Sequence, residues 1–203
     1  MCQVDVTDLF DVVHRQRACR SFASEPVDDD LVERVLDAAI HAPSAENRQP
    51  WVFVVVRDPD RRATIGELNR RAWEGGGRAH SEARLSPSLL ADVEHGAQEG
   101  IGAAPVLVVV CGDAELGLPA TLPSSVFPAI QNLLLAATAL GLGSAMTTLA
   151  TGFTAELAAL LDLPDHVRPM AIVPLGRPVR PLGPPRREPL STRVHRERYG
   201  ARW

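Results

Sequence analysis

Three short clusters in the sequence hold side chains that could bind a polar ligand. Bases crowd together over Arg15–Phe22, and two adjacent arginines stand in the Pro-rich stretch Pro184–Pro189. The stretch Ala42–Trp51 offers Ser, Asn and Gln on a loop that two prolines keep rigid, so these groups donate and accept hydrogen bonds in fixed directions. Taken alone, the cluster Arg15–Phe22 is best explained as a solvated basic turn. The simple explanation of Pro184–Pro189 is a surface strap, and that of Ala42–Trp51 is a polar connection between a helix and a strand.

Several signatures of common enzymes are absent from the sequence. It has no GxGxxG after a predicted strand, no GxxxxGKS/T loop, no GxSxG elbow and no HExxH helix. The six histidines never place two on one helical face beside a carboxylate, so we expect no metal site. Cys111 ends an apolar run, and we expect it to be a buried, inert thiol.

The charges are unevenly distributed along the chain. All 21 bases are Arg, none of them lies between residues 85 and 167, and residues 168–203 hold 9 Arg against 2 acids. A basic tail on an acidic body fits a nucleic-acid arm, a strap that docks on a partner, or a source of phosphate ligands for a cofactor. Because the tail holds five prolines and few aromatic residues, it is poorly suited to base stacking, and we expect no nucleic-acid partner.

Length and composition indicate the class of protein. With 203 residues, 45% of them hydrophobic, the chain has material for one sizeable core, and we expect a single domain over residues 1–203. The apolar stretches fall short of the roughly 20 residues that a membrane span needs, and no signal peptide is recognisable at the N-terminus. We therefore expect a cytoplasmic protein with reduced thiols and no membrane partner.

Hydrophobic periodicity predicts the helices and strands. Apolar residues at helical spacing predict six helices: one that carries Val6 to Val13 and stops near Arg15, one that starts over Pro26–Asp30 and is ended by Pro43, and Arg61–Trp73, Pro87–Glu99, Val126–Leu140 and Thr154–Leu161. Apolar and β-branched runs predict four strands, Trp51–Arg57, Val106–Cys111, Ser144–Thr148 and Met170–Leu175. Because helices outnumber strands without strict alternation, the pattern predicts an α+β fold with helices packed on a small sheet.

Glycine- and proline-rich stretches predict the irregular parts. Gly75–Gly77 should break the helix before it, and Gly112–Ser125 should be a connection. Gly176–Trp203 is too rich in proline for a regular element and is predicted to be an extended arm, whose apolar C-terminal residues indicate that it docks on another surface. The helix Val126–Leu140 is apolar on nearly all sides, so we expect it in the centre of the molecule or in a subunit interface.

The three clusters and one glycine motif follow one another along the chain in the same order as the motifs of a known family. The motifs are Arg17-x-x-Arg20-x-Phe22-x-x-x-Pro26-Val27, then Ala42-Pro43-Ser44-x-x-Asn47-x-Gln49-Pro50-Trp51-x-Phe53-x-Val55-Val56, then Gly141-Leu142-Gly143-Ser144, and Pro174-Leu175-Gly176 with Arg186-Arg187-x-Pro189. Together they resemble the FMN-dependent nitroreductase family over about residues 7–200, and the pattern from Asn47 to Trp51 is the most specific.

This resemblance implies a fold, an assembly and an activity. The implied fold is a nitroreductase-like α+β sandwich with a small, mostly antiparallel sheet surrounded by helices. The implied assembly is a homodimer in which the arm 176–203 of each subunit wraps the other and two FMN molecules bind in the interface. The implied activity is hydride transfer from NADH or NADPH through flavin N5 to a nitroaromatic, quinone or similar small acceptor, by a ping-pong mechanism. No side chain is implied as catalytic, because the flavin carries the chemistry.

The resemblance also implies roles for single residues. Arg17, Arg20 and one or both of Arg186 and Arg187 match the family's basic positions around the FMN phosphate, with Arg20 nearer the pyrimidine edge of the ring. A backbone N–H of Thr148 or Leu149 is placed against flavin N5, and the polar loop borders the flavin, often from the partner subunit. The implied cofactor-binding set is Gln16, Arg17, Ala18, Arg20, Pro43, Ser44, Asn47, Gln49, Thr147, Thr148, Leu149, Arg186 and Arg187.

Two positions depart from the family pattern, and alternatives stay open. Gln16 and Ala18 stand where the family commonly has a base and a Ser, so we expect a weaker hold on the phosphate. Residues 73–100 match no flavin or substrate contact. Flavin enzymes that dehalogenate, dehydrogenate a biosynthetic intermediate or break down flavin would share these motifs, and so would a non-enzymatic flavin-binding protein.

Overall fold

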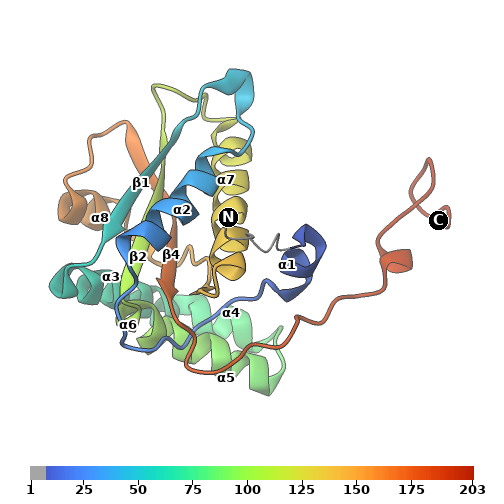
Figure 1. Ribbon diagram of the computed structural model, residues 1–203, viewed down its shortest axis with the longest axis horizontal. Helices are drawn as coiled ribbons and strands as arrows, with labels where there is room; N and C mark the ends of the chain where they lie inside the picture. Colours follow the sequence, from blue (N-terminus) through green and yellow to red (C-terminus); the bar gives the residue numbers. More distant parts are fainter. Residues whose placement is uncertain (1–7) are drawn as a thin grey trace, which may run out of the picture.

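In the computed structural model, which describes residues 8–203, four strands form one sheet at the centre of the molecule (Figure 1). They are β1 (Trp51–Val56), β2 (Val106–Asp113), β3 (Gly143–Ser144) and β4 (Val167–Gly176), in the order β1-β2-β4-β3, and every neighbouring pair is antiparallel. Val109 of β2 stands opposite both Val54 and Ile172. An uninterrupted apolar run such as β2 suits a strand that is paired on both edges and covered on both faces.

The alternation of side chains along β2 divides the core into two. Alternate residues from Val106 to Val110 pack with α2 (Asp29–Ile40) and α7 (Leu122–Ala139). Those from Leu107 to Cys111 pack on the opposite face with α3 (Pro59–Ala72), α6 (Ile101–Ala103) and α8 (Thr154–Leu161). Helices therefore cover both faces of a small antiparallel sheet (Figure 1), and the predicted α+β sandwich is confirmed.

Helices α7 and α2 lie on the same face of the sheet and pack against each other. Val126 and Ile130 on the inner side of α7 are buried, whereas Phe127 on its outer side is 36% exposed. Helix α7 begins four residues before the predicted start, because a proline is tolerated in the first turn, where its missing N–H has no helical partner. The connection predicted over Gly112–Ser125 is correspondingly shorter.

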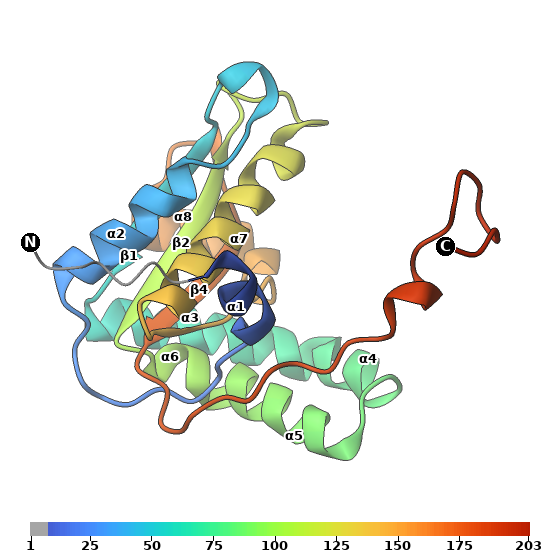
Figure 2. The same cartoon turned by 45° about the vertical axis from the view of Figure 1, so that its right-hand side comes forward.

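Helix α1 (Leu9–Arg15) is short and lies beside α7 (Figure 2). Its N-cap is Asp8, whose carboxylate accepts the Phe10 N–H at 2.9 Å. Phe10 is 71% exposed, and Leu9 and Val13 are exposed beside it. The predicted stop near Arg15 is confirmed, and Val6 lies outside the described residues.

Several short helices follow one another between β1 and β2. The predicted break at Gly75–Gly77 is confirmed as a kink, because Gly76 has a φ of 145°, outside the helical range, within the turn Trp73–Gly77 that links α3 to α4 (Arg78–Glu82). The buried indole of Trp73 anchors this turn. A π turn, Gly96–Gly100, links α5 (Pro87–His95) to α6. Helices α4 and α5 therefore form a lobe at the lower end of the sheet (Figures 1 and 2).

The predicted boundaries of two strands are wrong. The strand expected at Ser144–Thr148 is only Gly143–Ser144, although Thr147 rejoins the sheet in an isolated bridge to Ile172. The strand expected at Met170–Leu175 is longer, Val167–Gly176, because Val167 pairs with Asp113 at the end of β2. Periodicity identified both strands, but cross-strand pairing sets where each one ends.

The arm from Arg177 onward is extended, as predicted. It first pairs with the segment before α2, through the bridge between Phe22 and Pro178. It then leaves the body of the molecule and ends in a 3-10 turn, Leu190–Thr192, and a hairpin-like loop (Figures 1 and 2). Tyr199 and Trp203 in this loop are 93% and 75% exposed. Among residues 8–203, none of the helices combines the length and apolar character that crossing a bilayer requires.

Candidate functional site

The basic segment between α1 and α2 runs along the lower end of the sheet (Figure 1). The Cys19 N–H donates to Ser144 O at 2.8 Å, and Ala18 pairs with Ser144 in a parallel bridge. These contacts fix the backbone of the segment against β3. Arg17 and Arg20 consequently line one shared space.

That space is a cavity of about 210 Å³. Arg17 and Arg20 line it together with Arg180 and Asp92, and the backbone of the arm up to Gly183 forms another wall. Arg17 Nη1 donates to Gly183 O at 3.4 Å. Three guanidinium groups against one carboxylate make the cavity positive, and their forked donors match the oxygens of a phosphate or a carboxylate.

Two charged residues of this cavity belong to none of the sequence motifs. Arg180 lies in the arm and Asp92 in α5, and neither belongs to a motif with Arg17 or Arg20. Only the tertiary fold brings the four charged residues together. The excess of Arg in the C-terminal tail was the one signal in the sequence that pointed to Arg180.

The remaining predicted phosphate residues lie around this cavity or beyond it. Ala18 is among its lining residues, and Gln16 forms the C-cap of α1 just before it. Arg186 and Arg187 line a separate, open depression on the arm with two further charged side chains. The structure thus brings Arg17, Ala18 and Arg20 together and holds Arg186 and Arg187 outside their cavity.

The predicted polar loop is exposed and strained. Pro43 opens the loop, the Gln49 N–H donates to Ser44 Oγ at 3.0 Å, and Gln49 Nε2 donates to Asn47 O at 3.4 Å. Glu46, Asn47 and Gln49 have φ angles of 55°, 53° and 52°. Each non-glycine residue in this left-handed region costs roughly 1 kcal/mol or more. Such strain persists where the surroundings determine the conformation, and binding loops are a common place for it.

The polar loop and the basic cavity lie at opposite ends of the sheet. Figures 1 and 2 both show the connection from α2 to β1 at the upper end and the connection from α1 to α2 at the lower end. Within one chain, therefore, the two groups of predicted residues do not meet.

A third group of predicted residues is held by a buried amide. Thr147 pairs with Ile172 through two backbone hydrogen bonds of 2.9 Å, and its hydroxyl donates to Asn69 Oδ1 at 3.0 Å. Asn69 is fully buried and donates from Nδ2 to Ala97 O at 3.0 Å. A buried amide with both ends paired rigidifies what it touches. No sequence pattern pointed to Asn69.

This buried network decides which backbone N–H is available for a ligand. The Leu149 N–H already donates to Thr147 Oγ1 at 3.3 Å. Among residues 8–203, the Thr148 N–H has no hydrogen-bond partner, and Thr148 lies outside the regular elements. Thr148 therefore offers the free donor of the pair Thr148 and Leu149.

The two described cysteines offer no reactive thiolate. Burial raises the pKa of the Cys111 thiol to about 12. Burial also raises the pKa of Cys19, whose Sγ donates to Ser21 O at 3.3 Å. Both thiols are protonated at neutral pH, which agrees with the expected inert role of Cys111.

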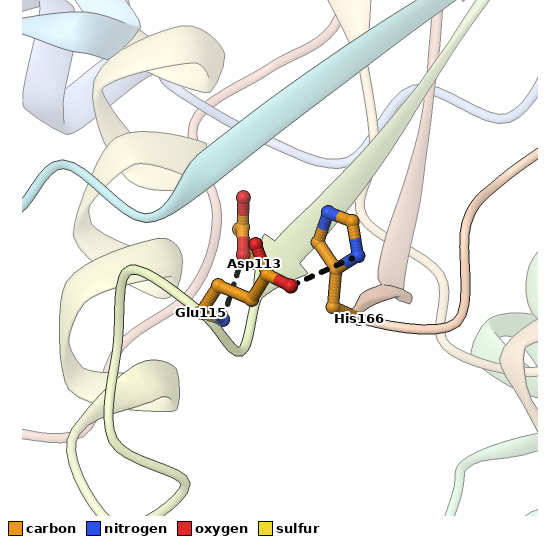
Figure 3. Close-up of side chains that lie close together, drawn as sticks. All are labelled: Asp113, Glu115 and His166. Atoms are coloured by element: carbon orange, nitrogen blue, oxygen red, sulfur yellow. Dashed lines mark hydrogen bonds and ion pairs between the residues drawn. The ribbon is translucent and has the colours of Figure 1, made fainter.

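One cluster of metal-ligand types lies beside the polar loop, where the Asp113 N–H donates to Pro50 O at 2.7 Å (Figure 3). Asp113 ends β2, Glu115 follows it, His166 precedes β4, and one ligand atom of each lies within 4.8 Å of the others. Asp113 Oδ1 accepts the Glu115 N–H at 2.8 Å, and Glu115 Oε1 lies 3.7 Å from His166 Nδ1. A turn-stabilising carboxylate and an exposed contact between Glu115 and His166 account for this arrangement, and we assign no ion to it.

Known proteins show where this chain belongs. The model of the nitroreductase family matches residues 13–177. An NADH dehydrogenase of Thermus thermophilus is 34% identical, over 92% of this chain and 94% of the relative. A 5,6-dimethylbenzimidazole synthase of Rhodospirillum rubrum is also 34% identical, over 80% of this chain and 78% of the relative.

The solved structures give the same answer. A structure from Desulfovibrio desulfuricans, described as a nitroreductase in complex with FMN, matches with a TM-score of 0.73. It is 26% identical and the match covers 95% of this chain and 98% of that one. The sheet order, the helices on both faces and the family match over most of the sequence lead to one conclusion. The chain belongs to the nitroreductase family.

Proposed function

We propose that this protein is an FMN-dependent oxidoreductase that passes hydride from NADH or NADPH to a nitroaromatic, quinone or similar small acceptor. The observation that carries the proposal is the cavity in which Arg17, Arg20 and Arg180 converge on a backbone fixed by β3. The related structure from Desulfovibrio desulfuricans holds FMN, and the relative from Thermus thermophilus is named for an NADH-dependent reaction.

The donors in the cavity suit an FMN phosphate. A phosphate dianion that leaves water needs bidentate charged donors or backbone N–H donors in its place. The guanidinium groups of Arg17 and Arg180 supply the bidentate charged donors. Gln16 and Ala18 contribute a neutral amide and a backbone N–H at the positions where the family commonly has a base and a Ser. Arg180 supplies a charge that those two positions lack. Arg186 and Arg187 follow Gly183 closely in the chain, and we place them at the outer rim of the phosphate site.

The residues at the ring would be Arg20 and Thr148. We assign the contact with flavin N5 to the Thr148 N–H, because the Leu149 N–H is already bonded to Thr147 Oγ1. Arg20 would face the pyrimidine edge of the ring, where a cation favours the anionic reduced form. Thr147 acts through its hydrogen bond to Asn69, which keeps the strand end and the Thr148 amide in place.

The bound FMN would supply the hydride chemistry, accepting from the nicotinamide and giving to the acceptor at one face. The chain supplies position and electrostatic environment. Near the cavity, Asp92 is the one carboxylate among the lining residues, and it is paired with Arg20. We therefore assign no general acid or base, and a shared face implies that donor and acceptor bind in turn by a ping-pong mechanism.

We propose further that the complete site forms in a homodimer. The strained loop with Ser44, Asn47 and Gln49 lies at the opposite end of the chain from the cavity, so it reaches a flavin only in a second subunit. The apolar residues Phe10, Tyr199 and Trp203 are exposed in the single chain, and a partner would cover them. Wrapping of the arm around the partner would complete this interface.

A second candidate is a flavin enzyme with another reaction. Its support is that the relative named 5,6-dimethylbenzimidazole synthase is as similar to this chain as the relative named NADH dehydrogenase, at 34% identity each. A test distinguishes the two. Incubated in air with reduced FMN, an enzyme of the second kind consumes the flavin irreversibly, whereas a reductase returns all of it as oxidised FMN.

The proposal is tested first by cofactor binding. Apoprotein titrated with FMN should quench the flavin fluorescence to saturation at one FMN per chain. Riboflavin, which lacks the phosphate, should bind at least about tenfold more weakly, since the loss removes the charge-assisted contacts of the cavity. Equal affinity for FMN and riboflavin would remove the phosphate assignment, and no binding of either would remove the function. The cytoplasm, where NADH and NADPH are supplied, is the proposed compartment.

A further inference from the structure

Asp92 belongs to no motif in the sequence, yet its carboxylate meets a residue of the proposed flavin site. Asp92 Oδ2 lies 2.7 Å from Arg20 Nη1, and both side chains line the basic cavity. The pair is shielded on most of its surface, with 23% of the Arg20 side chain and 34% of the Asp92 side chain exposed. A charge-assisted hydrogen bond in such a place is stronger than an exposed ion pair.

The helix that carries Asp92 is shaped to lie against Arg20. Asp92, Gly96 and Gly100 recur every four residues, so they share one face of α5 and the π turn after it. A Cβ at Gly96 would lie 2.6 Å from Arg20 Cδ, and one at Gly100 would lie 1.9 Å from Arg20 O. Only glycine permits this approach, which places the Asp92 carboxylate at the tip of the Arg20 side chain.

Strand β3 also holds the backbone next to Arg20. The neighbouring residues Ala18 and Cys19 are bonded to Ser144 of β3. Because β3 and the π turn hold the main chain around Arg20, the direction of the Arg20 side chain depends on what its guanidinium binds. Among residues 8–203, Asp92 is its one hydrogen-bond partner, and it occupies Nη1 alone. The Nε and Nη2 donors remain free for a ligand.

We propose that Asp92 is a positioning residue for Arg20 that also balances its charge, and that this pair sets the reduction potential of the bound flavin. The inference rests on the proposed function, in which Arg20 faces the pyrimidine edge of the ring. A guanidinium at that edge stabilises the negative charge of the reduced flavin, and a carboxylate bonded to it offsets part of that effect. Asp92 thus keeps the flavin a stronger reductant than Arg20 alone would.

The test is the reduction potential of FMN bound to a set of variants, measured by equilibration with a reference dye. Asp92→Asn keeps the shape and removes the charge, so the potential should rise. The expected change is about tenfold in the ratio of reduced-state to oxidised-state affinity, or about 30 mV for two electrons. Asp92→Glu should restore a potential close to that of the parent protein.

Two controls separate this effect from others. Glu94→Gln removes an equal charge two residues along the same helix, from a carboxylate that pairs with Arg78 at 2.8 Å, and should leave the potential unchanged. In an Arg20→Gln background, the Asp92→Asn shift should disappear, because the effect passes through Arg20. Thermal melting of each variant checks that the fold is intact.

The outcomes are distinguishable. An unchanged potential in FMN-loaded Asp92→Asn overturns this inference and leaves the proposed function standing. Equal shifts in Asp92→Asn and Glu94→Gln, or a shift that persists in the Arg20→Gln background, also overturn it, since the charge would then act without Arg20. A parent protein that binds no FMN overturns the proposed function and this inference together.

Discussion

At the scale of single residues, the arginines of the basic cavity give the clearest indication of which ligand binds there. Arg17 and Arg180 come from opposite ends of the sequence and face the same space, one from the segment after α1 and the other from the arm. Neither guanidinium is bonded to a carboxylate in the described residues. Two such cations side by side repel one another unless an anion lies between them, and a phosphate has the charge and the oxygens for that place.

Substitution of these arginines should weaken FMN binding. We expect Arg17→Ala and Arg180→Ala each to raise the Kd for FMN by about tenfold or more, because a hydrogen bond to a charged group contributes about 1.5–3 kcal/mol. Fluorescence titration of the apoproteins measures the change, and Arg61→Ala, an exposed arginine on α3, serves as the control. An affinity that is unaltered in both cavity variants would contradict the phosphate assignment.

The buried thiol of Cys111 should make the stability of the fold depend on pH above about pH 9. Burial raises its pKa from the ordinary 9.0 to about 12, so the folded state holds the proton more tightly than the unfolded state. The stability from Cys111 is therefore complete below about pH 9 and is lost as the pH rises towards 12, by at most about 1.4 kcal/mol per pH unit. Urea unfolding between about pH 9 and pH 10.5 should show a shallower loss in Cys111→Ala. Parallel slopes in parent and variant would contradict this account.

At the scale of elements, the sequence predicted most helices and strands but not all of their bounds. Helix α8 has the predicted bounds, Thr154–Leu161, because its apolar spacing and its flanks agree. The lobe of α4 and α5 departs most from the prediction. The glycine run Gly75–Gly77 does break the helix, with a φ of 145° at Gly76, but helical structure resumes directly after it in α4, which the sequence pattern did not predict.

The sequence also pointed to only part of the residues that line the basic cavity. Arg17, Ala18 and Arg20 share one cavity because they are local in sequence, and the motif showed them. Asp92 and Arg180 enter the same cavity only through tertiary packing, which no spacing in the sequence encodes.

Glycines in the lobe offer a matched pair of substitutions. Gly100→Ala would place a Cβ 1.9 Å from the Arg20 carbonyl oxygen, so the helix must move, and we expect a loss of at least about 2 kcal/mol in the free energy of unfolding. Gly75→Ala meets nothing within 4 Å in a helical turn and should stabilise by up to about 1 kcal/mol. Urea denaturation compares the two. If both variants lose the same stability, the close packing of the lobe on Arg20 is wrong.

At the scale of the whole molecule, the proposed homodimer would cover apolar residues that the single chain exposes. The family match ends at residue 177, and the arm beyond it projects from the body with exposed apolar residues (Figure 1). The exposed face of α1 and the outer side of α7 offer further apolar surface for a partner. That residues 1–203 form a single domain stays a prediction. The docking of the arm on the second subunit is part of the proposed homodimer.

The shared site predicts complementation between subunits. Light scattering should give the mass of a dimer. An Arg17→Ala, Arg20→Gln chain and an Asn47→Ala, Gln49→Ala chain should each bind FMN poorly. Mixed dimers of the two should regain one tight site in two, because one interface then keeps an intact cavity and an intact loop. Mixed dimers that bind no better than either parent variant would place the whole site within one chain.

The measurement that tests the central claim most directly is the visible spectrum of the FMN-loaded protein during anaerobic addition of NADH and then NADPH, followed by a nitroaromatic or a quinone. We predict that the flavin absorbance bleaches with at least one donor and returns when the acceptor is added, each in a separate step. Bound flavin that neither donor bleaches, or that bleaches and is not reoxidised by either acceptor, would contradict the assignment of a reductase.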